Sequence, residues 1–74
     1  MKVTINKLEP LISDDSKMFA YFDYLGRQVR TIITPKSLKY LKVEKISVGE
    51  IVDVQKGVRN NKVVYIITKV MRNG

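Results

Sequence analysis

The fold is decided by residues 18–33, whose sequence is MFAYFDYLGRQVRTII. Aromatic and β-branched residues, which favour strands, fill the two halves of this stretch on either side of Leu25-Gly26. A two-residue loop at that point, with glycine where a positive φ is needed, would join the halves as an antiparallel hairpin. The stretch therefore predicts two neighbouring strands, Lys17–Tyr24 and Arg27–Thr34.

This loop also sets which side chains share a face of the hairpin. With Tyr24 opposite Arg27, successive side chains alternate between two faces, and a slip of one residue would exchange them. The apolar face is predicted to point into the domain and holds Met18, Ala20, Phe22, Val29, Thr31 and Ile33. The other face mixes aromatic, cationic and polar groups and holds Phe19, Tyr21, Asp23, Gln28, Arg30 and Ile32.

The rest of the chain predicts one more strand before the hairpin, then a helix and two strands after it. Thr34-Pro35 is typical of a helix start, because threonine caps and proline suits the first helical position. Asn and Gly in the segment 57–61 predict a loop. The expected elements are strand Lys2–Leu8, loop Glu9–Ser16, helix Pro35–Lys42, strand Glu50–Lys56, loop Gly57–Asn61 and strand Lys62–Met71.

The predicted order, β-β-β-α-β-β over residues 1–74 as a single domain, resembles the OB-fold. This fold is a small, mainly β, five-stranded and partly open Greek-key barrel with one short helix between strands three and four. The resemblance implies that strands two and three form the main surface for oligonucleotides. It also implies that the loop between strands four and five rims the cleft. An SH3-like barrel is the alternative.

Composition excludes most catalytic and metal sites. The 74 residues contain neither Cys nor His, so thiolate chemistry, imidazole ligands and Ser-His or Cys-His catalysis are absent. Four glycines are scattered and form no phosphate-binding motif. The adjacent Asp14 and Asp15 could form a turn, a site for a hard cation or a loop that contacts a protein. Of these interpretations, the turn is favoured. We expect no enzyme, no cofactor and no metal.

Charge indicates a polyanionic partner. The formal net charge is +7, with −1 in residues 1–25 and +8 in residues 26–74. Such an excess in a small domain favours nucleic acid, an anionic surface or an acidic protein. The chain has no apolar run that could span a membrane and no signal-peptide core, so we expect a cytoplasmic protein that does not enter membranes.

The candidate binding residues follow from the mixed face and from the basic segments. Phe19 and Tyr21 would stack on bases, and cations would contact phosphates. Alternatively, the rings are covered by a chain terminus or a partner, and the basic loop is a solvated tip. Lysines of the helix (Lys36, Lys39 and Lys42) are interpreted as a solvated face. The phosphate-binding candidates are Arg27, Arg30, Lys56, Arg59 and Lys62.

These observations favour a small protein that binds single-stranded nucleic acid with little sequence dependence, DNA ahead of RNA. Its size would suit a phage, a plasmid or another mobile element, with a role in DNA replication. The alternative is a protein-interaction module that uses the same aromatic face, as an accessory or inhibitor of an acidic host or replication protein. A homodimer through residues 63–71, which are apolar on both faces, is a further possibility.

Overall fold

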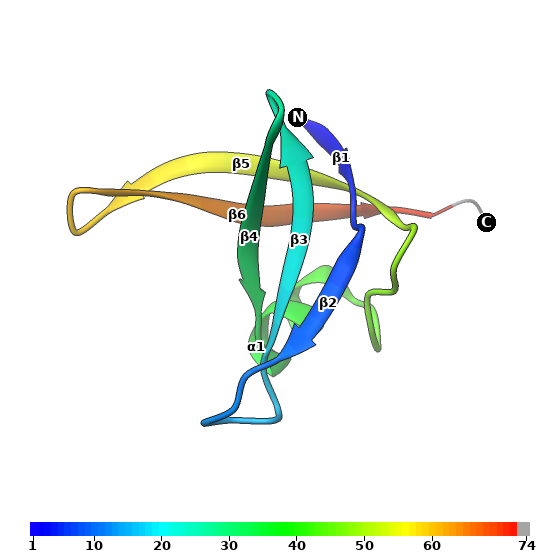
Figure 1. Cartoon of the computed structure of the whole chain (residues 1–74). Coiled ribbons are helices and arrows are strands. Elements are labelled where there is room, and N and C mark those ends of the chain that lie inside the picture. The colour runs from blue at the N-terminus through cyan, green and yellow to red at the C-terminus, as the bar shows by residue number, and fades with distance from the viewer. Residues whose placement is uncertain (73–74) are drawn as a thin grey trace.

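Six strands and one short helix form two three-stranded antiparallel sheets in the computed structural model, which describes residues 1–72 (Figure 1). One sheet has the strand order β1-β5-β6 and the other β2-β3-β4. The elements are β1 (Lys2–Thr4), β2 (Lys7–Pro10), β3 (Met18–Tyr24), β4 (Arg27–Ile33), α1 (Pro35–Leu41), β5 (Ile51–Arg59) and β6 (Lys62–Met71).

The first predicted strand is wrong, because the chain passes there from one sheet to the other. Ile5 and Asn6 separate β1 from β2, and the Ile5 side chain is fully buried. The Ile5 amide donates to the Glu50 carbonyl at 2.9 Å, whereas the next amide, Asn6, donates to the Tyr21 carbonyl at 2.8 Å. One bent segment thus serves both sheets. The strand β2 continues to Pro10, so the following loop begins two residues later than predicted.

The central hairpin has the predicted register. Tyr24 pairs with Arg27 and Met18 with Ile33, and both turn residues, Leu25 (φ 52°) and Gly26 (φ 76°), have positive φ. The predicted inward face is confirmed, since Ala20, Phe22, Thr31 and Ile33 are buried while Met18 and Val29 are half-buried. Alternation along the strands therefore identified the core side of this sheet correctly.

The predicted helix is present and ends one residue earlier than expected. The Thr34 hydroxyl caps it by accepting a hydrogen bond from the Ser37 amide at 3.1 Å, and Pro35 follows in the first turn. Lys42 adopts the left-handed conformation (φ 60°) that closes the C-terminus, so it lies outside the helix.

The predicted loop at residues 57–61 is also wrong, because the two strands continue through it. β5 runs to Arg59, β6 begins at Lys62, and Asn60 (φ 53°) and Asn61 (φ 62°) alone make the turn. Asparagine tolerates positive φ, which allows a two-residue hairpin turn here. β1 pairs only with Ile51–Asp53, so residues 56–65 extend as a two-stranded ribbon. Figure 1 shows this ribbon, here called the arm, projecting from the body.

The two sheets meet where β6 passes β4. The Phe22 and Tyr65 rings form a T-shaped contact with centroids 5.7 Å apart, and the Thr31 hydroxyl donates to the Tyr65 carbonyl. No strand ladder joins β4 to β6 in the described residues, so the sheets do not close into a barrel. The buried apolar core comprises Val3, Ile5, Ala20, Phe22, Ile33, Ile46, Val52, Val54 and Ile67.

Candidate nucleic-acid interface

The mixed face of the β2-β3-β4 sheet brings Phe19 and Arg30 together. The guanidinium carbon of Arg30 lies 4.1 Å from the centroid of the Phe19 ring, a cation–π contact between neighbouring strands. Phe19 is half-buried, and Ile32, its cross-strand partner, is exposed. A cation therefore lies stacked on an aromatic ring on a solvent-facing sheet, and this stacked pair could contact a base and its phosphate.

Tyr21 lies on the same face in a more polar setting. Its hydroxyl donates to a Glu9 carboxylate oxygen at 3.0 Å, and the Lys7 ammonium lies 5.1 Å from its ring centroid. Lys7 and Glu9 are also paired with each other, at 3.6 Å. Asp23 is exposed further along β3. The face is thus cationic at β4 and contains carboxylates toward β2 and the end of β3.

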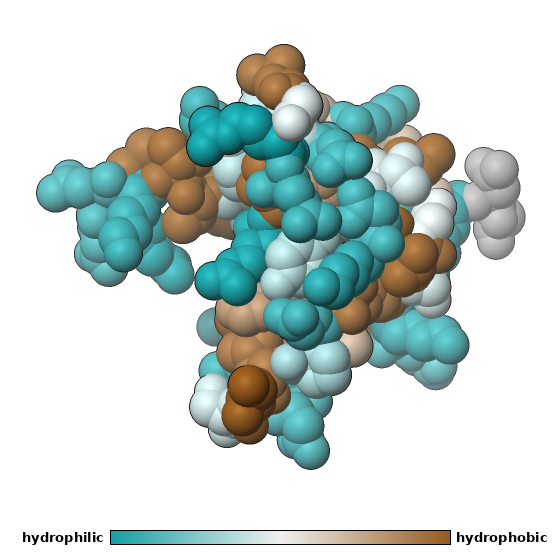
Figure 2. All heavy atoms as spheres, in the orientation of Figure 1, coloured by the Kyte–Doolittle hydropathy of each residue, from teal (hydrophilic) through white to brown (hydrophobic). Residues whose placement is uncertain are grey.

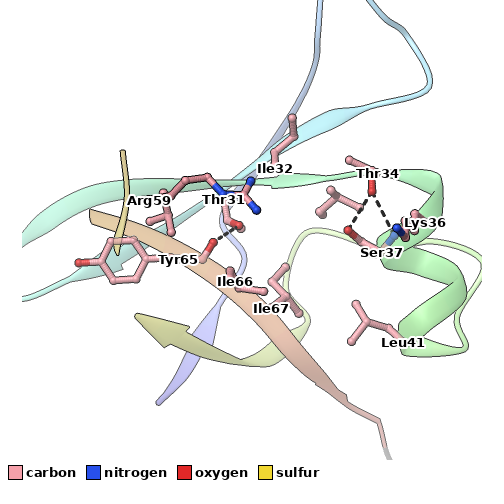
Figure 3. Close-up of a pocket in the computed structure, with 12 residues that line it drawn as sticks. Thr31, Ile32, Thr34, Lys36, Ser37, Leu41, Arg59, Tyr65, Ile66 and Ile67 are labelled. Carbon is pink, nitrogen blue, oxygen red and sulfur yellow. Dashed lines mark hydrogen bonds between the residues drawn. The ribbon is translucent and has the colours of Figure 1, made fainter. Parts of the chain in front are cut away.

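Two grooves flank the place where the arm leaves the body. The turn-side groove, of about 490 Å³, is lined by Tyr24, Leu25, Arg27, Gln28, Val29, Lys56, Val63 and Tyr65. The helix-side groove, of about 420 Å³, is lined by residues 31–34, Lys36, Ser37, Leu41, Arg59 and residues 64–67 (Figure 3). Both include Tyr65, which lies beside Thr31 at the crossing of β6 and β4.

Each groove contains one cation from the arm and one from the body. Lys56 and Arg27 line the turn-side groove, and Arg59 and Lys36 line the helix-side groove. Within residues 1–72, no carboxylate lines either groove and none of these four cations forms an ion pair. Figure 3 shows the Arg59 side chain beside β4, with Lys36 farther along on α1. Both grooves therefore favour an anionic ligand.

The hydroxyl groups of the helix-side groove are already engaged in the fold. Thr31 donates to the Tyr65 carbonyl, and the Thr34 and Ser37 hydroxyls lie 2.9 Å apart at the helix cap (Figure 3). The groups left to meet a ligand there are the two cations and the apolar side chains around them, including Ile66, which is 55% exposed.

The seven residues predicted from the sequence do not form one surface. Phe19, Tyr21 and Arg30 share the mixed face, as their alternation predicted. The other four are distributed over the two grooves and the arm: Arg27 and Lys56 on the turn side, Arg59 on the helix side, and Lys62 opposite Arg59 in the ladder next to the turn.

Sequence reasoning missed Lys36 and Tyr65. The spacing of Lys36 predicts a solvated helix face and does not indicate that Arg59 of β5 lines the same groove. The sequence predicts Tyr65 only as part of an apolar strand, yet its ring makes T-shaped contacts with Phe22 and, at 5.9 Å between centroids, with Tyr24.

The favoured interpretation of Asp14 is confirmed. Its carboxylate accepts hydrogen bonds from the Ser16 hydroxyl at 2.6 Å and the Ser16 amide at 3.1 Å, which closes a turn. These hydrogen bonds hold the pKa of Asp14 below its usual value. The described residues contain no group of three acidic, His or Cys side chains able to hold a metal ion.

Comparison of the chain with protein-family models, curated protein sequences and solved structures finds no match. Among residues 1–72, no helix is long and apolar enough to cross a membrane.

Proposed function

We propose that this protein binds nucleic acid, and single strands in particular, without strong sequence preference. The observation that carries the proposal is the group of unpaired cations along β4 and the arm, beside a solvent-facing sheet that contains Phe19 and Tyr21. Cations meet phosphates, whereas exposed rings suit unstacked bases. Stacking on a ring needs no particular base, which is why little sequence dependence is expected.

An OB-fold-like architecture is part of this proposal. The bent segment β1–β2 contributes to both sheets, α1 lies between β4 and β5, and β4 and β6 approach without a ladder. These features support a partly open barrel of the OB type, in which the β3–β4 surface corresponds to the oligonucleotide-binding strands.

The test compares a labelled single-stranded oligonucleotide with wild-type protein and with two matched variants, followed by fluorescence anisotropy. Tyr21→Leu removes a ring from the mixed face, whereas Tyr40→Leu removes a ring that is 76% exposed on the helix. We expect Tyr21→Leu to weaken binding by about 1–3 kcal/mol, the usual contribution of one stacked base. Equal losses for both variants, or none, would contradict the stacking proposal.

A protein-interaction module remains the second candidate because of one observation. Arg30 and Phe19 are already stacked, and Ile32 beside them is 46% exposed, so the face resembles a preformed interface patch. Salt separates the two proposals. For a single strand, the logarithm of the binding constant should fall linearly with the logarithm of the salt concentration. The slope should be about −0.7 for each phosphate contacted. Failure of every oligonucleotide to bind would favour the protein partner.

A further inference from the structure

Stacking of bases on the β3–β4 face explains the charge of the arm but not its projecting shape. It is a hydrogen-bonded two-stranded ribbon rather than a loop, and it projects sideways from the body (Figure 1). Lys56, Arg59 and Lys62 are exposed on it, and the sequence from Val54 to Arg72 contains no acidic residue. Figure 2 shows hydrophilic side chains at its outer end and apolar surface nearer the body.

The two grooves lie on opposite sides of the point where β6 crosses β4 and the arm begins. Residues 27–29 of β4 line the groove on the turn side and residues 31–33 line the groove on the helix side, with Tyr65 between them. Each groove has its own pair of unpaired cations. The arm therefore has a positively charged recess on both of its flanks, which suits a partner with two parallel rows of negative charge.

We propose that the arm enters the major groove of duplex DNA, with one phosphate backbone in each flanking groove. This rests on the proposed function and makes its substrate a junction: a single strand on the mixed face that continues into a duplex held by the arm. Arg27 and Lys56 would face one backbone, and Lys36 and Arg59 would face the other. Val58, which is 74% exposed and lines neither groove, would meet the base edges.

Dimensions favour the DNA major groove. That groove is about 12 Å wide and about 8.5 Å deep and admits a two-stranded ribbon in undistorted DNA, whereas the minor groove is about 6 Å wide and is entered by strands where the duplex is kinked. From Lys56 to Arg59 the arm advances about 10 Å at the usual rise per residue, enough to reach the groove floor. The major groove of duplex RNA is too narrow for side chains to enter, so the arm selects DNA.

A second copy of this chain fits the arm poorly. Pairing two arms would bring Lys56, Arg59 and Lys62 of each copy together with no carboxylate on either ribbon to offset them. Like charges directly opposed across a ladder are destabilising. Charge complementarity therefore favours a polyanion over self-association.

The first test measures binding of three labelled oligonucleotides: a single strand, a blunt duplex, and a duplex with that single strand as its tail. We expect the tailed duplex to bind about tenfold or more tightly than the single strand, because two joined sites raise the effective concentration. Arg27→Gln with Lys56→Gln, or Lys36→Gln with Arg59→Gln, should abolish that gain. Each pair should weaken binding of the single strand by less than it weakens binding of the tailed duplex. Each pair should also reduce the salt slope for the tailed duplex by about 1.8.

The matched control is Lys39→Gln with Lys45→Gln, which removes the same charge from exposed positions outside both grooves. It should leave the gain and the slope near the wild-type values. If the control lowers both as much as the groove variants do, the effect is net charge alone and the arm proposal is overturned.

The second test locates the arm on the DNA. The chain has no cysteine, so Val58→Cys on the arm and Val48→Cys in the segment before β5 each provide one attachment point for an iron chelate that cleaves nearby backbones. Cleavage of both duplex strands from position 58, and not from position 48, is the expected result. Cleavage confined to the tail, or equal from both positions, would overturn the proposal.

The outcomes separate the two levels of the argument. If the single strand binds in a Tyr21-dependent way and the duplex adds nothing, the arm proposal fails and the proposed function stands. If no oligonucleotide binds, both fail.

Discussion

The crossing of β4 and β6 offers the sharpest test of how this fold is held together. Thr31 is 5% exposed, and its hydroxyl donates to the Tyr65 carbonyl, which joins the two sheets where no ladder does. Thr31→Val keeps the shape of the side chain and removes the donor, which leaves a half-buried carbonyl without its partner. The loss is expected to be about 1–2 kcal/mol.

That loss is large for so small a domain. At about 0.05–0.15 kcal/mol per residue, 74 residues correspond to a total stability of roughly 4–11 kcal/mol. The change should lower Tm by about 5–15 °C. Urea unfolding followed by circular dichroism should show a lower midpoint with an unchanged m-value, since the surface exposed on unfolding stays the same.

Two further variants make the result interpretable. The Thr68 hydroxyl also donates to a carbonyl, that of Asp53 at 3.3 Å, but it is exposed, so Thr68→Val should change stability by less than about 0.5 kcal/mol. Thr31→Ser retains the donor and should be less destabilised than Thr31→Val. If Thr31→Val and Thr68→Val unfold alike, the sheets are held by packing of Phe22 on Tyr65 and the hydrogen-bond argument is wrong.

Three more outcomes follow from the core, the central turn and the N-terminus. Phe22 is fully buried, so Phe22→Ala should lower the free energy of unfolding by about 3–5 kcal/mol and bring the domain close to unfolding at 25 °C. A loss under about 1 kcal/mol, measured by urea unfolding, would contradict this placement. Leu25 is 82% exposed and has a φ of 52°. Asparagine tolerates that conformation better than leucine does, so Leu25→Asn should raise the urea midpoint. A lower midpoint would contradict backbone strain at this turn. The Met1 amino group donates to Asp53 at 2.9 Å and holds the pKa of that carboxyl below 3.8. The small stabilisation of the folded state by this ion pair is therefore complete above pH 3.8. It is lost as the pH falls through the lower pKa of the folded state. Urea midpoints from pH 7 to 2 should therefore fall less for Asp53→Asn than for wild type, and identical profiles would refute this coupling.

Part of the candidate site could be predicted from the sequence and part could not. Phe19, Tyr21 and Arg30 could be placed on one face from the sequence, because alternation along a hairpin with a known turn is a local property. The contacts of Tyr21 with Glu9 and Lys7 could not be predicted, because both partners lie on β2. The pairing of β2 with β3 depends on a bend after β1, and the regular alternation of residues 2–8 gives no sign of that bend. The presence of Lys36 and Arg59 in one groove could not be predicted for the same reason, because they lie on separate elements that line the same groove only in the folded chain.

By itself, the sequence determined the central hairpin, its inward face, the Thr34-capped helix and the excess of positive charge. Each of these depends on neighbours a few residues apart: a turn that needs positive φ, a period of two, or a cap three residues from its donor. Only the tertiary structure decided the break at Ile5–Asn6, the projecting arm and the two grooves beside β4. These depend on where β6 crosses β4. That crossing is set by contacts of Tyr65 with Phe22 and Thr31, which lie more than thirty positions earlier in the chain.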